Sequence, residues 1–180
     1  TAYLDAGSQI VYANTFGANR EKLANCGVTV EEVVQAAVSL AKQAAQGRGL
    51  VALDIGPIGQ LLQPTGTLEF EEAVDIFAQV VRAGVAAGAD LTVIETMTDL
   101  QEARAALLAV KENSSLPVMV TMTYESTGRT FLGCSPACAA LTLEGMGADA
   151  IGINCSLGPR EMPPLVEELI AWTNLPIVLK

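Results

Sequence analysis

The sequence predicts an α/β fold: a (β/α)8 TIM barrel of which about six consecutive βα units are present. Two observations support this. Strand-length runs of β-branched and aliphatic residues alternate with stretches of helical period, and a pair of loop sequences recurs at a fixed distance. Composition agrees, because 51% hydrophobic and only 4% aromatic residues suit helices packed closely on a buried parallel sheet.

Six strands are expected, and each ends in a polar or functional residue. A closed barrel has eight strands, so residues 1–180 are predicted to form a single partial barrel domain that leaves two sheet edges open. Self-association through these edges is therefore expected. The predicted strands are 10–15, 50–54, 91–96, 117–123, 150–154 and 176–179.

The repeat consists of two helix-to-strand loops that recur as a pair. Residues 88–91 (Gly-Ala-Asp-Leu) match 147–150 (Gly-Ala-Asp-Ala), and 115–118 (Ser-Leu-Pro-Val) match 174–177 (Asn-Leu-Pro-Ile), both 59 residues apart. Such pairing of βα units is typical of a barrel whose alternate strands fill alternate core layers. An open doubly wound sheet is less favoured, because no glycine-rich phosphate-binding sequence opens the first helix.

Two helix starts have the spacing of a capping box, in which a side chain and a backbone group satisfy each other. Thr29 is followed by Glu32, and Thr98 by Gln101. We expect one helix to begin after each threonine.

Charge and composition exclude several classes of partner. The net charge is −10 and no Lys/Arg cluster offsets it, so nucleic acid and anionic membranes are poor partners. There is neither a signal-peptide pattern nor an apolar run of roughly 18 residues, and a cytoplasmic protein is expected. Histidine is absent, which excludes imidazole acid–base catalysis and imidazole metal ligands in these residues.

Polar side chains gather at the predicted strand ends. Because the carboxyl ends of parallel strands meet at one mouth of a barrel, these side chains are expected to converge there. Two carboxylates, several hydroxyls and a thiol can hold a small zwitterion or a metal. The candidate residues are Asn14, Thr15, Asp54, Glu95, Asn154 and Cys155.

Each candidate also has a structural interpretation. Glu95 ends an apolar strand, where a carboxylate either pairs with a cation or binds a ligand's amino group. Asp54 can brace the following loop through backbone N–H groups. Cys155 is either a small buried hydrophobe or a functional thiol. Free thiols or metal ligation are expected before disulfides, and packing or surface positions are assigned to Cys26, Cys134 and Cys138.

Four motifs, in order, resemble those of the homocysteine S-methyltransferase domain. The resemblance covers essentially the whole chain and is closest to the N-terminal module of cobalamin-dependent methionine synthases. The motifs are Asn-Thr-Phe-Gly-Ala-Asn (14–19), Asp-Ile-Gly-Pro-Ile-Gly (54–59), Ile-Glu-Thr (94–96) with Asp99 and Glu102, and Gly-Ile-Asn-Cys-Ser (152–156) with Gly-Pro (158–159).

The resemblance implies a catalytic zinc ion held by three cysteine thiolates. One ligand corresponds to Cys155; the other two are adjacent in a Gly-Gly-Cys-Cys-Gly motif of the last strand, and this chain has no Cys-Cys pair. The family's first and last strands are missing by the same comparison. Free thiols ionise only near pH ~8.5, and zinc would stabilise the homocysteine thiolate for attack on a methyl group.

The resemblance also implies roles for the remaining candidates. Glu95 would hold the homocysteine ammonium; Asn14, Thr15 and Asp54 would shape the pocket, and Asn154 would support it. Methylcobalamin is the favoured methyl donor, with betaine and S-methylmethionine as alternatives. Cobalamin- and folate-binding modules would lie elsewhere in a longer chain.

Two other functions stay open at this point. One is a carbon–carbon lyase or aldolase barrel in which Glu95 and Asp54 bind a divalent metal. The other is a fragment that is inactive on its own, which agrees with the expectation that the isolated 180 residues lack activity and bind zinc weakly.

Overall fold

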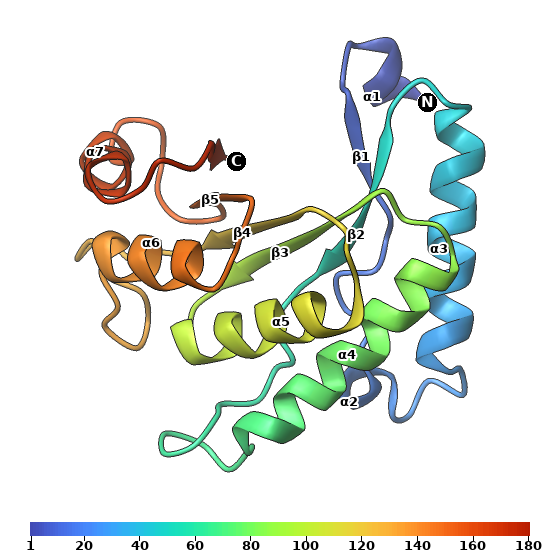
Figure 1. Ribbon diagram of the computed structural model, residues 1–180, viewed down its shortest axis with the longest axis horizontal. Coiled ribbons are helices and arrows are strands. Elements are labelled where there is room, and N and C mark those ends of the chain that lie inside the picture. Colours follow the sequence, from blue (N-terminus) through green and yellow to red (C-terminus); the bar gives the residue numbers. More distant parts are fainter.

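The computed structural model describes residues 1–180 as a six-stranded parallel sheet that curls into part of a barrel, with helices along its outer face (Figure 1). Its strands lie in sequence order, so that β1 and β6 are the two free edges. They are β1 (Ile10–Tyr12), β2 (Leu50–Ile55), β3 (Leu91–Met97), β4 (Val118–Met122), β5 (Ala150–Ile153) and β6 (Ile177–Leu179).

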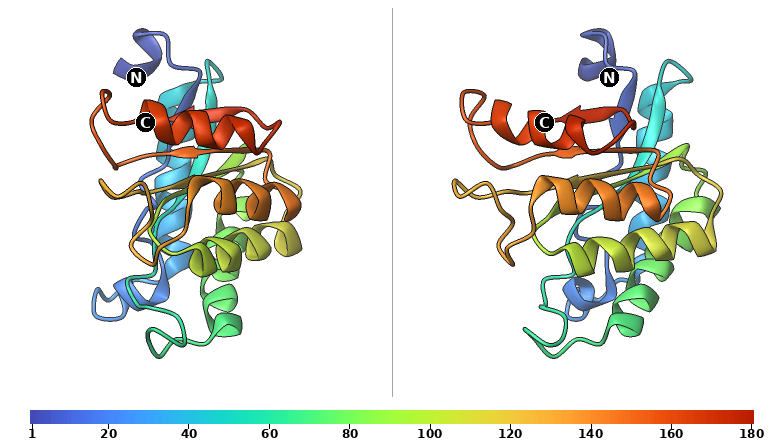
Figure 2. Two further views of the ribbon diagram at one scale, coloured as in Figure 1. Left: turned by 90° about the vertical axis from the view of Figure 1, so that its left-hand side faces the viewer. Right: turned by 60° about the vertical axis from the view of Figure 1, so that its left-hand side comes forward.

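Helices connect successive strands and cover one side of the sheet, as two further views show (Figure 2). The α/β class and the partial barrel predicted from the sequence are therefore confirmed. None of the helices is both long and apolar enough to cross a membrane. They are α1 (Ala2–Asp5), α2 (Arg20–Leu23), α3 (Val30–Ala45), α4 (Phe70–Ala86), α5 (Leu100–Asn113), α6 (Pro136–Gly145) and α7 (Pro163–Ala171).

All six predicted strands are present, and their ends differ from the prediction by at most three residues. The largest difference is in the first strand, predicted over 10–15, because β1 ends at Tyr12. After Ala13, the Thr15 hydroxyl donates to the Asp54 carbonyl at 2.8 Å and accepts from the Asp54 N–H at 2.9 Å. A side chain thus replaces the backbone pairing there and turns the chain away from the sheet.

One of the two predicted capping boxes forms. The Thr29 hydroxyl accepts from the Glu32 N–H at 3.2 Å, and the Glu32 carboxylate accepts from the Thr29 N–H at 2.8 Å. The second prediction is wrong by one residue, because Asp99 and not Thr98 caps α5. The Asp99 carboxylate accepts from the Gln101 N–H at 2.8 Å, and aspartate is a strong N-cap residue.

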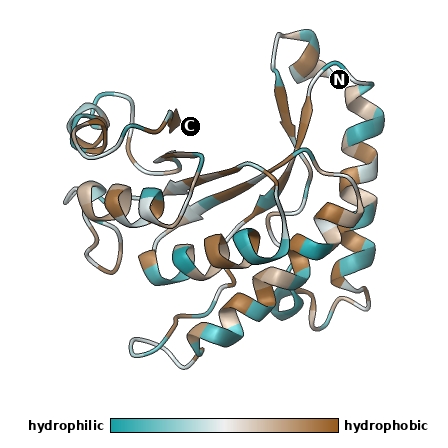
Figure 3. Cartoon of the chain, viewed as in Figure 1, coloured by the Kyte–Doolittle hydropathy of each residue, from teal (hydrophilic) through white to brown (hydrophobic).

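The main hydrophobic core lies between the sheet and its helices. Side chains alternate along each strand, so that Val51 and Leu53 of β2 join the helix-facing core while Ala52 belongs to a smaller apolar group inside the barrel. Figure 3 shows the hydrophobic residues along the strands and on parts of the helices, with hydrophilic residues interspersed on the helices. Gly84 of α4 lets this helix approach closely, because a Cβ there would be 2.4 Å from a Leu53 methyl carbon.

The loop after β2 is held by a buried carboxylate. Glu102 of α5 is only 4% exposed and accepts a hydrogen bond from the Ile58 N–H at 2.6 Å. Burial raises the pKa of Glu102 to about 7, although the Ile58 N–H opposes the rise. This contact fixes residues 56–59 beside the carboxyl end of the sheet.

Gly152 of β5 is the position at which the sheet has least room for a side chain. A Cβ there would be 1.8 Å from the Val178 carbonyl oxygen of β6. Gly152→Ala should therefore force β5 and β6 apart and lower the free energy of unfolding by about 3 kcal/mol or more. Urea denaturation would measure this, and Gly145→Ala serves as the control, since nothing lies within 4 Å of a Cβ at that exposed helix position. Equal stability of Gly152→Ala and Gly145→Ala would contradict the conclusion that β6 leaves no room for a side chain at Gly152.

Glu102 gives a prediction about pH. Its pKa is about 7 in the folded protein against 4.5 for the free side chain, so the folded state keeps a proton that the unfolded state loses. The stability that Glu102 contributes is full below about pH 4.5 and falls as pH rises towards 7. Glu102→Gln keeps the acceptor for Ile58 and should reduce this pH slope.

Glu102→Leu should instead cost about 1–3 kcal/mol at pH 5, because the Ile58 N–H loses its acceptor. Chemical denaturation of the wild type and both variants between pH 4.5 and 7.5 checks the two effects. A Gln variant with the wild-type pH slope would show that Glu102 does not hold the extra proton.

Candidate functional site

The predicted site residues do come to the same mouth of the curled sheet, but they differ in how accessible they are. Asn14 is exposed, whereas Thr15 is buried and both its hydrogen bonds go to the Asp54 backbone. Thr15 therefore joins the ends of β1 and β2, and its hydroxyl is already occupied by protein groups.

Two acidic side chains face the interior at this mouth. Asp54 is 7% exposed, and one of its carboxyl oxygens is buried without a hydrogen-bond partner. Burial raises the pKa of Asp54 to about 7; the charge of the nearby Glu95 adds to the rise and that of Lys180 opposes it. An unpartnered buried carboxyl oxygen is costly unless a cation or a donor reaches it. The structure thus places an unsatisfied acceptor in the mouth.

Glu95 follows the buried stretch of β3, and its side chain is 11% exposed. It forms an ion pair with the Lys180 ammonium, which comes from the end of β6. Of the two alternatives read from the sequence, a cation partner or a ligand's amino group, the structure shows the cation partner. Lys180 and its neighbour Tyr12 were not among the predicted site residues.

Asn154 connects the ends of three strands. Its side-chain oxygen accepts from the Thr96 N–H and from the Thr121 hydroxyl, both at 2.8 Å, and its side-chain nitrogen donates to the Thr96 hydroxyl at 2.7 Å. The Asn154 carbonyl also accepts from the Thr123 hydroxyl at 3.0 Å. Asn154 is fully buried, so these bonds position the residues around it.

The two residues beside these contacts have an unusual backbone conformation. Thr96 has φ 61° and Cys155 has φ 50°, both in the left-handed region. This conformation is costly for residues with a Cβ, above all for a β-branched threonine, and it clusters at functional sites. Thr96 follows Glu95 and Cys155 follows Asn154, so the hydrogen bonds of Asn154 hold the backbone next to Glu95 and next to Cys155.

Cys155 is exposed at the mouth, which agrees with a functional thiol and not with a buried hydrophobe. The Ser156 hydroxyl steadies the next residue, since it accepts from the Tyr124 N–H at 2.8 Å and lies 3.1 Å from the Asn154 carbonyl. A tetrahedral zinc site needs several ligands, and no three Cys, Asp or Glu side chains of the chain come together as a metal site. These 180 residues therefore offer one exposed thiol at the mouth, Cys155, and do not enclose a zinc ion by themselves.

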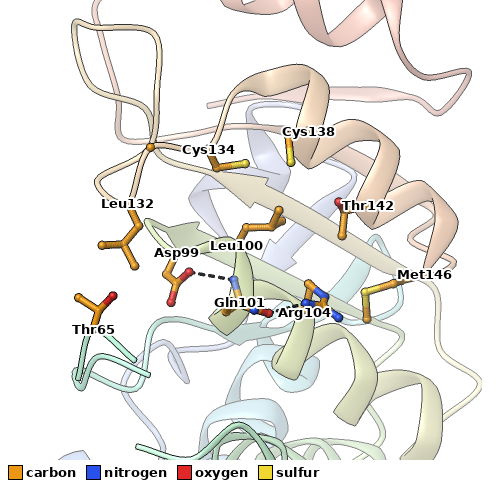
Figure 4. Close-up of a pocket in the computed structure, with 11 residues that line it drawn as sticks. Thr65, Asp99, Leu100, Gln101, Arg104, Leu132, Cys134, Cys138, Thr142 and Met146 are labelled. Carbon is orange, nitrogen blue, oxygen red and sulfur yellow. Dashed lines mark hydrogen bonds between the residues drawn. The ribbon is translucent and has the colours of Figure 1, made fainter. Parts of the chain in front are cut away.

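The other three cysteines lie away from the mouth. Cys26 is exposed after α2, whereas Cys134 and Cys138 line a cavity of about 600 Å3 beside α5 and α6 (Figure 4). Burial, and Cys138 nearby, raise the pKa of Cys134 to about 12, which keeps it a thiol. This cavity also exposes Arg104, but it contains none of the predicted site residues.

Lys180 and Tyr12 had only a weak signal in the sequence. Side chains alternate across a strand, so a strand over 176–179 with Ile177 facing the helices would turn Lys180 inward. The facing direction follows from the register, in which Ile177 pairs with Ile151 of the helix-facing core. That register is a tertiary property, and the sequence pattern alone does not give it.

Solved structures similar to this chain show the same fold. The homocysteine methyltransferase MmuM from Escherichia coli, in its metallated form, has a TM-score of 0.87 and 22% identity over 98% of this chain and 68% of that one. A 2,3-dimethylmalate lyase has a TM-score of 0.57 and 15% identity over 99% of this chain and 61% of that one. At these identities the likeness concerns architecture alone.

Two curated relatives are more similar in sequence. The methionine synthases of Mycobacterium tuberculosis and Mycobacterium leprae are each 29% identical to the chain over 188 residues. The match covers 97% of this chain but only 16% of the length of each relative. The family model described as Homocysteine S-methyltransferase matches residues 1–180, and the chain belongs to the homocysteine S-methyltransferase family.

Proposed function

We propose that the chain is the homocysteine-binding module of a methyltransferase that methylates the homocysteine thiol and releases methionine. One observation carries the proposal: in a chain of this family, the Asn154 side chain binds Thr96 and so joins the strand ends that bear Glu95 and Cys155. A carboxylate and a thiol at one mouth match the ammonium and the sulfur of a small amino thiol.

Glu95 supplies the charge that binds the substrate ammonium. Its side chain is largely buried, where a charged hydrogen bond is stronger than in water. Asp54 lies close enough for the two carboxyl groups to influence each other, and one of its oxygens is buried without a partner. Asn14 is exposed at the rim, and Thr15 and Asn154 keep the strand ends in place.

Cys155 is proposed as one thiolate ligand of a catalytic zinc ion. When bound, zinc would stabilise the thiolate form of homocysteine, which is the nucleophile at neutral pH. The hydrogen bonds of Asn154 to Thr96 and Thr121 hold the backbone just before Cys155, and Cys155 itself is exposed. The further ligands would have to come from outside residues 1–180.

Methylcobalamin is the proposed methyl donor, by similarity to the methionine synthases. The chain spans only 16% of their length, which leaves room for cobalamin- and folate-binding modules in a longer protein. Betaine or S-methylmethionine are the alternative donors. We also propose a cytoplasmic location.

A metal-dependent lyase is the second candidate function, because Asp54 and Glu95 are two interacting carboxyl groups at the mouth. A lyase would depend on magnesium or manganese bound by these carboxylates and would be indifferent to the Cys155 thiol. The two functions therefore differ in whether they require the Cys155 thiol.

Cys155→Ser in the complete protein should lower bound zinc to well below one per chain and reduce methyl transfer to homocysteine at least about 100-fold, because a hydroxyl is a poor zinc ligand at neutral pH. Zinc is measured by mass spectrometry of the metal after gel filtration, and methionine by chromatography. Cys26→Ser, at an exposed position away from the mouth, should retain both. Full zinc and activity in Cys155→Ser, with magnesium or manganese dependence, would favour the lyase.

Glu95→Gln should weaken homocysteine binding about 10- to 100-fold, the usual value of a hydrogen bond to a charged group. Calorimetric titration measures this, and 4-mercaptobutanoate, which lacks the ammonium, should bind the variant no less tightly than the wild type. Glu112→Gln on the exposed side of α5 is the matched control. Equal weakening of both ligands in Glu95→Gln would mean that Glu95 does not bind the ammonium.

A further inference from the structure

The carboxylate proposed to bind the substrate ammonium already has an ammonium partner within the chain. Lys180 pairs with Glu95, although the two residues are 85 positions apart and lie on β3 and at the end of β6. The Glu95 side chain is 11% exposed and that of Lys180 is 45% exposed. A largely buried anion is thus neutralised by a cation whose stem still reaches solvent.

The surroundings of the Lys180 ammonium form a small cage. The nitrogen lies 4.4 Å from the centroid of the Tyr12 ring, which is a favourable distance for a cation over an aromatic face. Asp54, with its unpartnered oxygen, is close enough for its charge to act on Lys180. Two carboxyl groups and an aromatic ring make a subsite suited to a single ammonium group.

Lys180 is well placed to enter and leave this cage. Its N–H donates to the Ile153 carbonyl at 3.1 Å, which continues the pairing of β6 with β5 and fixes its backbone beside Asn154. Burial lowers its pKa, but the hydrogen bond and the charge of Glu95 outweigh this, and the pKa of Lys180 is raised. The side chain is therefore a charged group on a flexible stem, anchored at the mouth.

We infer that Lys180 occupies the ammonium subsite when no ligand is present, and that an α-amino acid displaces it from Glu95 and pairs its own carboxylate with the released Lys180. The inference rests on the proposed function, and it makes Lys180 a determinant of specificity. An incoming ammonium must replace one that is already bound, so binding the ammonium alone gains little. A ligand that also carries a carboxylate restores a partner to Lys180.

This exchange has a physical reason. An isolated charge is costly in a partly buried site, so that both Glu95 and Lys180 need partners in every state. In the free protein they pair with each other. In the complex a zwitterion satisfies both, whereas a simple amine supplies no carboxylate to take the place of Glu95 at Lys180. The arrangement therefore selects against amines by leaving a charge unpaired.

The test compares L-homocysteine with 3-aminopropane-1-thiol, which is the same molecule without its carboxylate. Calorimetric titration of the complete, zinc-loaded protein gives the ratio of the two dissociation constants. In Lys180→Met this preference for homocysteine should fall at least about 10-fold, because homocysteine loses a charge partner and the aminothiol no longer competes with Lys180. Lys180→Arg should keep the wild-type preference.

Lys111→Met is the matched control, since Lys111 makes an ion pair with Asp149 away from the mouth. It should leave the ratio unchanged. Thermal unfolding of all variants checks that they are folded, and only folded variants enter the comparison. If Lys180→Met is unfolded, a crystal structure of the wild-type protein with homocysteine shows whether Lys180 still contacts Glu95.

Three outcomes would overturn the inference. Lys180→Met with the wild-type ratio, even if both ligands bind less tightly, would limit Lys180 to a structural role. A crystal structure of the homocysteine complex in which Lys180 still contacts Glu95 would exclude the exchange, whereas a ligand nitrogen on Glu95 and a ligand carboxylate on Lys180 would support it. Failure of the wild-type protein to bind homocysteine would refute the proposed function as well.

Discussion

The buried side chain of Asn154 is the contact on which the mouth of this sheet depends. Parallel strands are hydrogen-bonded along their length, but at their carboxyl ends the chain must turn away and the backbone groups lose their partners. Asn154 supplies both an acceptor and a donor to Thr96 and accepts from Thr121 as well. One amide group therefore ties together the carboxyl ends of β3, β4 and β5, next to the shift in the β3–β4 register between Ile94 and Met97.

The hydrogen bonds of Asn154 explain why a strained backbone is tolerated at Thr96 and Cys155. A left-handed threonine and a left-handed cysteine are each costly in isolation. The hydrogen bonds of Asn154 to both the N–H and the hydroxyl of Thr96 hold the first, and the strand immediately before Cys155 is held by the same amide. Asn154 thus offsets local backbone strain at the residue after Glu95 and at Cys155.

The architecture was predictable from the sequence because it rests on periodicity and repeats. The six strands and the partial barrel follow from apolar runs, and the polar strand ends follow from the geometry shared by all parallel sheets. The interactions at the mouth were not predictable in the same way. Thr15 was expected to shape the pocket and Asn154 to support it, but the sequence did not indicate which protein groups their polar atoms bind. Lys180 reaches Glu95 only through a register that tertiary packing sets.

The charges at the mouth explain how two acidic side chains can lie near each other in a largely buried place. Asp54 and Glu95 lie near each other, and buried like charges are not both retained without a cation. Part of the conflict is relieved by the rise of the pKa of Asp54 to about 7, and part by Lys180, which pairs with Glu95. Glu95 is thereby the carboxylate with a cation partner, and Asp54 is the one whose free oxygen meets a proton or a donor. A 2,3-dimethylmalate lyase of 15% identity shares the fold, so the difference in charge between these two carboxyl groups belongs to the site residues of this chain and not to its architecture.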